Sequence, residues 1–324
     1  MMRALQISTL AGPAAAHVIS LPIPEPRPGQ VLVKLNACGI NFADVAQSRG
    51  LYIGGPRPPY VPGVEAAGTI AALGDGVEGL SVGQRVMCMG TRAFAEYGVF
   101  PAAALLPTPD DWTDAQAAAM PVQWLTAHGC LRTIGNLRPG ETVLIHAVAG
   151  GVGLAALRLA KHYGATVIGT ASSAAKLQLA SARGLDLGID YTREDFAARV
   201  KEFTGGRGVD LVLEMVGGET FRSNLTVIRP FGRMVVYGAA SNESARLDNV
   251  RLIFSPIAVM GYHLTVLMTQ RPDLFAAEMV EFRELIAAGV VRPEEPSAWP
   301  LDQGAAALAA MEGRQTTGKQ VLIP

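Results

Sequence analysis

The feature that most restricts the fold of this chain is a strand–turn–helix–strand pattern between residues 141 and 169. An apolar run from Thr142 to Ala147 leads into a glycine-rich turn from Val148 to Gly153. An amphipathic segment, residues 154–163, and a second apolar run, residues 165–169, follow. Continuous apolar runs without alternation are typical of parallel strands buried on both faces. The pattern therefore predicts a βαβ unit with a right-handed crossover, which belongs to a parallel α/β sheet.

The glycine-rich turn itself predicts a nucleotide ligand. Glycines let the backbone turn sharply and approach a diphosphate, and the start of the next helix offers N–H groups and a positive dipole end. The turn can match the three-glycine fingerprint of dinucleotide-binding folds in two registers. Read as G-x-G-x-x-A, it uses Gly151, Gly153 and Ala156; in the other register Val148 takes the first position and Gly150 and Gly153 are the second and third glycines. A tight turn without a ligand is the alternative, but the strand before it and the helix after it favour a dinucleotide. The contacts expected in this turn are Gly150, Gly151 and Val152.

The end of the second strand favours NADPH over NADH. An NAD-selecting site places an Asp or Glu there to bind the ribose hydroxyls, yet no acidic residue occurs between Gly164 and Leu185. Ser172 and Ser173 end the strand instead, and Lys176 follows. Hydroxyl groups and a cation suit a 2′-phosphate, which a carboxylate would repel. The alternative is that Ser172 only caps the next helix and that Lys176 is a solvated surface charge.

Composition limits the class of protein. With 324 residues, two domains are the natural expectation, and a net charge of −1 argues against nucleic acid or an anionic membrane as the main partner. The three cysteines are widely spaced and form neither a disulfide framework nor a zinc-knuckle spacing. The most apolar late run, from Ile257 to Met268, is too short to span a bilayer. We expect a soluble cytoplasmic protein without a signal peptide.

The pattern along the chain changes with position. Up to about residue 117, short alternating apolar runs are separated by proline and glycine, which predicts an all-β, barrel-like region with long loops. From Asp114 to Leu131 the pattern is helical, and from Glu141 the βαβ rhythm begins. Apolar runs at 209–215 and 233–237 predict further parallel strands, and a short run at the end, 319–323, predicts a final strand.

Several stretches, in this order, resemble the medium-chain dehydrogenase/reductase superfamily, and within it the zinc-independent quinone oxidoreductase branch. The similarity covers nearly the whole chain. The matching stretches are residues 38–44 (Cys-Gly-Ile-Asn-Phe-Ala-Asp), 49–52 (Arg-Gly-Leu-Tyr), 62–68 (Pro-Gly-Val-Glu-Ala-Ala-Gly), 83–86 (Gly-Gln-Arg-Val), 149–153 (Ala-Gly-Gly-Val-Gly) and 317–322 (Thr-Gly-Lys-Gln-Val-Leu).

The resemblance implies an α/β fold with two domains. A GroES-like β-barrel catalytic domain would occupy residues 1–119. A Rossmann domain with a doubly wound parallel sheet would occupy residues 120–264 and bind NADPH. Residues 265–324 would return to the catalytic domain.

Departures from the family pattern argue against a metal. Zinc-dependent relatives carry ligands at the positions of Asn41, Val64 and Val122, none of which is a zinc ligand here. The four-cysteine structural zinc lobe also has no counterpart. Since catalytic zinc needs three protein ligands and an open position, we expect no metal.

By the same resemblance, Asn41 and Tyr52 line the pocket next to the nicotinamide, where Tyr52 could donate a hydrogen bond or a proton to a carbonyl oxygen. Packing of Tyr52 and a turn-fixing role for Asn41 are the alternatives, and Asp44 is expected to orient backbone. A second tyrosine of some quinone-reducing relatives is absent near this loop, where Ala46 stands. The cofactor contacts implied are Gln123, Thr126, Tyr191, Val216, Tyr237, Gly238, Ala239, Tyr262, His263, Leu264 and Lys319, the last approaching the diphosphate; core packing is the alternative for Val216, Tyr237 and Leu264.

Three functions stay open at this point. The first is an NADPH-dependent quinone reductase, and the second is an enoyl or enone reductase, because residues 41–44 and 83–86 also resemble the enoyl-reductase modules of polyketide synthases. The third is a non-catalytic NADPH-binding protein, as lens crystallins of the family suggest. A homodimer is expected by resemblance, through an edge strand at residues 257–264.

Overall fold

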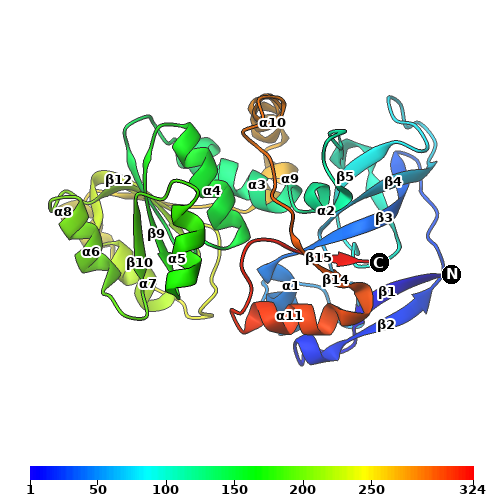
Figure 1. The fold of residues 1–324 in the computed structure, drawn as a ribbon, viewed down its shortest axis with the longest axis horizontal. Coiled ribbons are helices and arrows are strands. Elements are labelled where there is room, and N and C mark those ends of the chain that lie inside the picture. Colours follow the sequence, from blue (N-terminus) through cyan, green and yellow to red (C-terminus); the bar gives the residue numbers. More distant parts are fainter. The chain divides into compact units, whose positions relative to one another are not determined.

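The computed structural model describes the backbone of residues 1–324 and every side chain except that of Arg251. The chain forms two compact units (Figure 1). The first comprises Met1–Val122 and Pro293–Pro324, and the second comprises Gln123–Arg292. The sequence places the return to the first unit at residue 265, whereas residues 265–292 lie in the second unit.

The first unit is built on a seven-stranded sheet in the order β14-β15-β3-β4-β5-β7, with β6 also paired to β3, and on a separate β1-β2 hairpin. Apart from the parallel β14–β15 pair, its strands pair antiparallel. Its strands are β1 (Met2–Ile7), β2 (Ala16–Leu21), β3 (Gln30–Ile40), β4 (Glu65–Leu73), β5 (Arg85–Met89), β6 (Tyr97–Pro101), β7 (Leu105–Pro107), β14 (Ser297–Pro300) and β15 (Gln320–Ile323).

Alternation along β3 explains the core of this unit. Val31, Val33 and Leu35 point to the same side and are buried in one apolar cluster that also takes in Ile70 of β4 and Phe100 of β6. The register between β3 and β4 shifts twice, as it does at β-bulges, which bend a strand and allow the sheet to curve. The barrel-like β region expected from the sequence is therefore confirmed.

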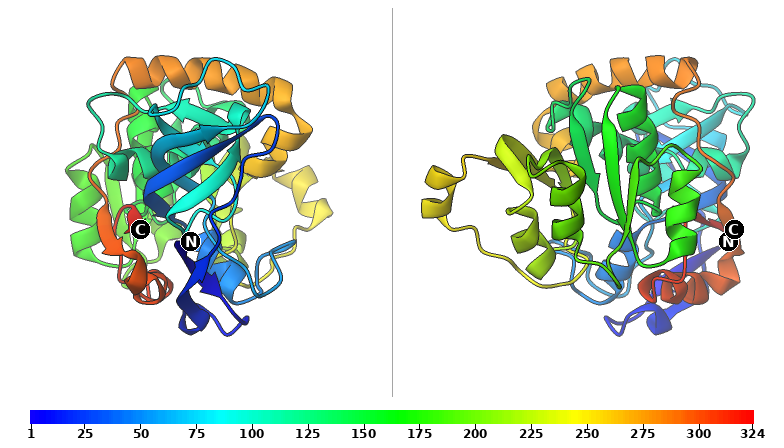
Figure 2. Two further views of the ribbon diagram at one scale, coloured as in Figure 1. Left: turned by 90° about the vertical axis from the view of Figure 1, so that its right-hand side faces the viewer. Right: turned by 60° about the vertical axis from the view of Figure 1, so that its left-hand side comes forward.

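Short helices complete the first unit. They are α1 (Phe42–Ser48), α2 (Asp114–Ala118), α11 (Gly304–Glu312), the 3₁₀ turns η1 (Pro13–Ala15), η2 (Ala102–Ala104) and η4 (Leu301–Gln303), and the first residues of α3 (Pro121–His128). The strand β15 pairs with β3, so the end of the chain adds a strand to the sheet begun near its start. Both termini lie at the same end of this unit (Figure 2).

The second unit contains a six-stranded sheet, parallel throughout, in the order β10-β9-β8-β11-β12-β13. Its strands are β8 (Thr142–Ile145), β9 (Thr166–Ala171), β10 (Leu187–Asp190), β11 (Val209–Glu214), β12 (Ile228–Val236) and β13 (Ala258–Gly261). The first strand in sequence, β8, lies inside the sheet, and the chain runs outward from it in both directions. The doubly wound parallel sheet is confirmed, and Figure 2 (right) shows its strands side by side.

Most helices of the second unit connect these strands, and the last two follow β13. They are α4 (Gly151–His162), α5 (Ala174–Ser181), α6 (Phe196–Phe203), α7 (Gly218–Asn224), α8 (Asn249–Phe254), α9 (Leu264–Gln270) and α10 (Pro272–Ala287), together with a π-helical turn η3 (Gly129–Thr133) that continues α3. In α4 the buried residues Ala155, Ala156 and Leu159 form the stripe that packs on β8 and β9.

Three local expectations differ from the structure. The helix after the glycine-rich turn begins at Gly151 rather than at residue 154, because the last glycines of the turn already have helical geometry. The helical stretch 114–131 is divided into α2, α3 and η3. The strand β10 was not expected, because its sequence Leu-Gly-Ile-Asp contains no continuous apolar run.

Candidate functional site

The glycine-rich turn after β8 is tightly folded. Ala147 has a positive φ of 50°, and the N–H of Gly150 donates to the carbonyl of Ala147 at 2.8 Å. A Cβ on Gly153 would lie 2.3 Å from the carbonyl oxygen of Ala147, so only glycine fits there, whereas a Cβ on Gly150 would lie 3.2 Å from the same oxygen. The turn thus leads directly into α4, whose first N–H groups, including that of Val152, face the approach to the carboxyl ends of the strands.

Gln123 packs against this turn. Its side-chain amide occupies the place that a Cβ on Gly151 would need, and Gln123 is buried. The glycine contacts were predicted from the turn itself and Gln123 from the family resemblance, and the structure brings these residues together within the second unit. Thr126, one helical turn further along α3, is half-buried.

At the end of β9, the side chains of Ser172 and Lys176 meet. Lys176 Nζ donates to Ser172 Oγ at 3.2 Å. The cap of α5 is Ser173, whose Oγ accepts from the Lys176 N–H at 3.4 Å, so the alternative that Ser172 caps this helix is wrong. The nearest acidic residue that follows, Asp186, receives Lys161 Nζ at 2.7 Å and the Val167 N–H at 2.7 Å. Asp186 is thereby held at the other end of the strand.

The loops after β11 and β12 lie against each other. The N–H of Ala240 donates to the Met215 carbonyl, and the N–H of Ser241 donates to the Val216 carbonyl, each at 2.8 Å. Val216, Tyr237, Gly238 and Ala239 therefore stand together at the carboxyl edge of the sheet, where ligands of parallel α/β sheets bind. Tyr191, which follows β10 at the same edge, is exposed.

Tyr262 and His263, two predicted cofactor contacts that follow β13, each make structural contacts in the second unit. Tyr262 is buried, packs on Gly129, where a Cβ would overlap its ring, and donates from its hydroxyl to the Leu125 carbonyl at 3.3 Å. The ring nitrogen Nδ1 of His263 accepts from the Val266 N–H and caps α9, which begins at Leu264.

In the first unit, Asn41 belongs to a buried polar cluster. Its Nδ2 donates to Glu65 Oε1 at 2.7 Å, and its Oδ1 accepts from Lys319 Nζ at 2.9 Å. Lys319 also forms an ion pair with Glu65, and the N–H of Val122 donates to Glu65 Oε2 at 2.7 Å. Burial lowers the pKa of Lys319, while the charge of Glu65 acts in the opposite direction. The ammonium predicted to approach a diphosphate is thus held by Asn41 and Glu65 in this structure.

Asp44 lies beside this cluster and binds backbone, as expected. Its carboxyl oxygens accept from the N–H of Asn41 at 2.8 Å, which completes a capping box at the start of α1, and from the N–H of Gly63 at 3.3 Å. Burial raises the pKa of Asp44 to about 7. Burial and, second, the charge of Asp44 also raise the pKa of Tyr52, so Tyr52 keeps its proton at neutral pH.

Sequence reasoning missed two residues of this region. Tyr60 is a second tyrosine near Asp44; burial, followed by the Asp44 charge, raises its pKa to about 12, and among the described side chains its buried hydroxyl finds no hydrogen-bond partner. Glu65 binds Asn41, Lys319 and Val122 at once. Its position inside the stretch 62–68 was a signal, because a carboxylate amid small apolar residues of a strand needs buried partners.

The positions of the zinc ligands of zinc-dependent relatives come together in the structure. Asn41 and the Val122 N–H both bind Glu65, which directly follows Val64. One amide and two aliphatic side chains are not a donor set that holds catalytic zinc. Nor do the described residues contain any group of three or more His, Cys, Asp or Glu arranged to bind a metal. Among the described residues no helix is both long and apolar enough to cross a membrane.

Two family models match this chain. The model for the alcohol dehydrogenase GroES-like domain matches residues 27–110, and the model for zinc-binding dehydrogenases matches residues 151–281. A 2-haloacrylate reductase of Burkholderia sp. is 35% identical over 100% of this chain and 99% of its own length. The chain belongs to the quinone oxidoreductase-like branch of the medium-chain dehydrogenase/reductase superfamily.

Two further members of this superfamily show how widely the similarity extends. The synaptic vesicle membrane protein VAT-1 homolog of Rattus norvegicus is 34% identical over 93% of this chain and 78% of its own length. The crystal structure of the Escherichia coli quinone oxidoreductase complexed with NADPH has a TM-score of 0.90 and 32% identity, over 99% of this chain and 100% of that one. The two family models, the 2-haloacrylate reductase and the quinone oxidoreductase show that the protein is an oxidoreductase with a GroES-like domain and a Rossmann domain.

Proposed function

We propose that the protein is a zinc-independent, NADPH-dependent reductase whose acceptor is a quinone or a similar electron-poor carbonyl compound. The observation that carries the choice of NADPH is the end of β9, where Lys176 Nζ lies 3.2 Å from Ser172 Oγ and no carboxylate follows in the strand. A hydroxyl and an ammonium match a 2′-phosphate in charge and hydrogen bonding. The complex of the similar E. coli quinone oxidoreductase with NADPH supports this choice.

The cofactor contacts that we propose gather at the carboxyl edge of the parallel sheet. The glycine-rich turn and the start of α4 would bind the diphosphate, because the first N–H groups of α4, which begins at Gly151, have no intrahelical partners. Ser172, Ser173 and Lys176 would bind the 2′-phosphate. The remaining contacts proposed are Gln123, Thr126, Tyr191, Val216, Tyr237, Gly238, Ala239, Tyr262, His263 and Leu264, with Lys319 the least favoured because Glu65 and Asn41 already bind its ammonium.

The chemistry supplied by bound NADPH is a hydride, and the protein contributes orientation and hydrogen bonding. We propose that Tyr52 donates a hydrogen bond, or its proton, to the acceptor oxygen as negative charge develops there. Its raised pKa keeps the hydroxyl protonated at neutral pH. The Asn41 amide would line the acceptor, held in one orientation by Lys319 at its oxygen and by Glu65 at its nitrogen.

A second candidate acceptor is a C=C bond conjugated to a carbonyl group. The 2-haloacrylate reductase is as similar in sequence as the quinone oxidoreductase, and its name specifies such a substrate. Segments of polyketide synthases also match, for example one from Aureobasidium melanogenum at 33% identity. The same Tyr52 contact would serve either acceptor, because both develop negative charge on a carbonyl oxygen.

Calorimetry with NADPH and NADH, followed by steady-state oxidation of NADPH with an acceptor panel, tests the proposal. We expect tighter binding of NADPH and turnover with 1,4-benzoquinone or 9,10-phenanthrenequinone. Turnover restricted to a crotonyl thioester or a simple enone would replace the quinone proposal with the second candidate. Absence of nucleotide binding, or stoichiometric zinc by elemental analysis, would refute it. Tight NADPH binding without any turnover would favour the non-catalytic alternative.

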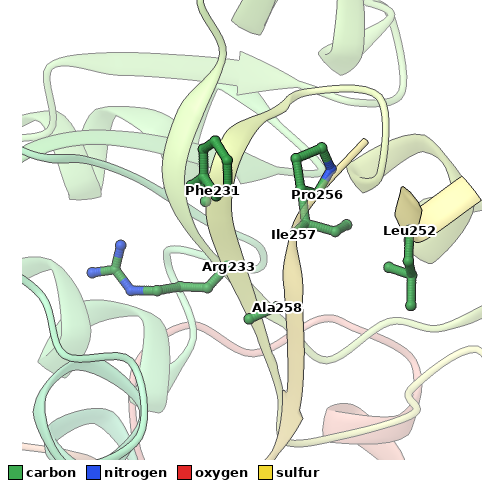
Figure 3. Close-up of a pocket in the computed structure, with 7 residues that line it drawn as sticks. Phe231, Arg233, Leu252, Pro256, Ile257 and Ala258 are labelled. Carbon is green, nitrogen blue, oxygen red and sulfur yellow. The ribbon is translucent and has the colours of Figure 1, made fainter. Parts of the chain in front are cut away.

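We also propose a homodimer formed through the edge strand β13. Its outer side pairs with no other strand of the described sheet, and an open edge is a template for a second copy. Beside it lies a cavity of about 340 Å³ lined by Phe231, Leu252, Pro256, Ile257 and Ala258 among others (Figure 3). Phe231 and Phe254 are 79% and 82% exposed, which is unusual for phenylalanine unless a partner covers it.

A further inference from the structure

A chain of four buried polar side chains crosses the centre of the parallel sheet. His146 follows β8, Thr170 lies near the end of β9, Glu214 ends β11, and Asn224 ends α7. The His146 ring binds Thr170 Oγ1 through Nδ1 at 2.9 Å and Asn224 Oδ1 through Nε2 at 2.8 Å. Asn224 Nδ2 in turn donates to Glu214 Oε2. All four side chains are buried, so each depends on the others for its hydrogen bonds.

This row of hydrogen-bonded side chains ends on backbone N–H groups of the loop after β11. Glu214 Oε1 accepts from the N–H of Val216 and from the N–H of Gly217, each at 2.6 Å. With Asn224 on the other oxygen, three N–H donors converge on this carboxyl group, so both of its oxygens act as acceptors. The carboxylate therefore fixes the path of the loop that contains Val216.

The carboxylate also fixes the direction of every hydrogen bond in the chain. Because both oxygens of Glu214 accept, Asn224 turns its Nδ2 toward Glu214 and its Oδ1 toward His146. His146 Nε2 then carries the proton, and Nδ1 accepts from the Thr170 hydroxyl. Burial lowers the pKa of His146, which keeps the ring neutral, and the edge of its ring packs on Phe196 at a centroid distance of 5.1 Å.

The four hydrogen-bonded side chains lie next to the proposed NADPH site. Neighbouring strands β8 and β11 lie where the connections leave in opposite directions, β8 toward β9 and β11 toward β12. In open parallel sheets this switch point is where ligands bind. The residues that follow His146, Thr170 and Glu214 are the glycine-rich turn, the pair Ser172 and Ser173, and Val216, which are the three loops proposed above for NADPH.

We propose that His146, Asn224 and Glu214 are positioning residues that hold these three loops in the geometry that binds NADPH. This inference rests on the proposed NADPH site. The three side chains touch one another and the loop backbone, and they act on the cofactor through the loops. The hydrogen bonds run in one direction, from Thr170 through His146 and Asn224 to Glu214.

The variant Glu214→Gln tests both the direction and the function. Its side-chain oxygen can still accept from the loop N–H groups, but its amide nitrogen donates to Asn224, so Asn224 must rotate and His146 must move its proton to Nδ1. Nitrogen-15 NMR of the histidine ring is expected to show the neutral Nε2–H form in the unaltered protein and the Nδ1–H form in the variant. We expect NADPH to bind about tenfold more weakly to the variant, because one set of charge-assisted hydrogen bonds is weakened. The KM for NADPH should rise, whereas kcat should change by less than about twofold.

The matched control is Asp210→Asn, which removes a buried carboxylate from the opposite end of the same strand. Asp210 binds Arg207 and Arg229 and receives the Thr142 N–H at 2.8 Å. This variant is expected to lower the midpoint of unfolding without changing the affinity for NADPH. If Glu214→Gln does not fold, Thr170→Val, which removes only the hydroxyl at the His146 end, is expected to weaken NADPH binding by about threefold.

The outcomes separate this inference from the proposed function. If the unaltered protein binds NADPH and both Glu214→Gln and Thr170→Val bind it equally well, the positioning role is refuted while the NADPH site stands. An Nδ1–H form of His146 in the unaltered protein refutes the direction. If the unaltered protein binds no NADPH, the proposed function fails, and the positioning role fails with it, although NMR still reports the hydrogen-bond direction.

Discussion

The ammonium of Lys319 and the carboxylate of Glu65 form an ion pair in the interior of the first unit, where their side chains are 6% and 0% exposed. The two residues belong to the tail strand region and to β4, so the last residues of the chain hold a charge that lies far earlier in the sequence. A buried pair of this kind is costly to break, because the remaining charge loses its partner without regaining water. The pair also orients Asn41, which binds both members.

The substitution Lys319→Met is expected to destabilise the protein by about 3–5 kcal/mol, because it leaves Glu65 buried without a counter-charge. Glu65→Gln in the same background should restore much of the loss, so the double variant costs less than the sum of the two single ones. Urea unfolding of the four proteins measures this coupling. The exposed Asp302, 3.5 Å from Arg3, is the control, and Asp302→Asn should cost less than about 1 kcal/mol. Additive effects in the Lys319–Glu65 cycle would contradict the interaction.

The raised pKa of Asp44 predicts that the protein loses stability as the pH rises from about 4 to about 7. Its pKa rises from 3.8 to about 7 on folding, so the folded protein binds a proton that the unfolded chain has already released in this range. Because the pKa of Asp44 is higher in the folded state, its contribution to stability is fully present below the unfolded pKa. That contribution is lost as the pH rises through the folded pKa. The effect is on the order of 4 kcal/mol, since one pKa unit corresponds to about 1.4 kcal/mol.

The test compares urea unfolding of the unaltered protein and Asp44→Asn across this pH range. The variant lacks the titrating carboxyl group, so the difference in unfolding free energy should shift in its favour as the pH rises. A constant difference between Asp44→Asn and the unaltered protein would show that Asp44 does not titrate in this window.

Lys176→Glu is expected to weaken binding of NADPH far more than binding of NADH. The new carboxylate would face the 2′-phosphate that only NADPH carries, beside Ser172. Loss of one charged hydrogen bond and addition of repulsion predict a loss of affinity for NADPH of at least about tenfold. Calorimetric titration with both nucleotides measures the ratio. Equal weakening of both would argue against a 2′-phosphate site at the end of β9.

Gly153→Ala is expected to reduce stability and nucleotide binding, whereas Gly150→Ala should cost far less stability. The added Cβ meets the Ala147 carbonyl at 2.3 Å at position 153 but at 3.2 Å at position 150. A shift of the turn should cost about 1–3 kcal/mol of stability at position 153 and weaken NADPH binding in proportion. Thermal unfolding and calorimetry on both variants provide the measurement. Similar behaviour of the two alanine variants would show that the turn is not tightly packed.

The homodimer proposal predicts a mass in solution of twice 34.0 kDa. Light scattering with Phe231→Ser and Phe254→Ser is expected to show weaker association, because both side chains are exposed beside β13. Val266→Ser, which changes a 53% exposed apolar residue on α9, serves as the control. A monomeric mass for the unaltered protein would refute the dimer.

Much of the fold could be predicted from the sequence because its signals are local. The apolar run at Thr142–Ile145 and the helical stripe of α4 each appear within a dozen residues, and the resemblance motifs are contiguous. The short strand β10 carries no such signal, because its sequence Leu-Gly-Ile-Asp contains no continuous apolar run. The alternative role for Ser172, a cap of α5, falls to Ser173 instead, because adjacent serines are equivalent in sequence and only the backbone conformation selects between them.

Local patterns were enough to predict the class of this protein: parallel strands around a glycine-rich turn, no acidic residue after β9, and no zinc ligands at the expected positions. Which polar residues meet became visible only in the folded chain. His146 binds Asn224 across 78 positions of sequence, and Lys319 reaches Asn41 across 278. Such pairs leave no periodic pattern, because what selects them is the cost of burying polar groups unpaired, and that cost exists only once distant segments have packed together.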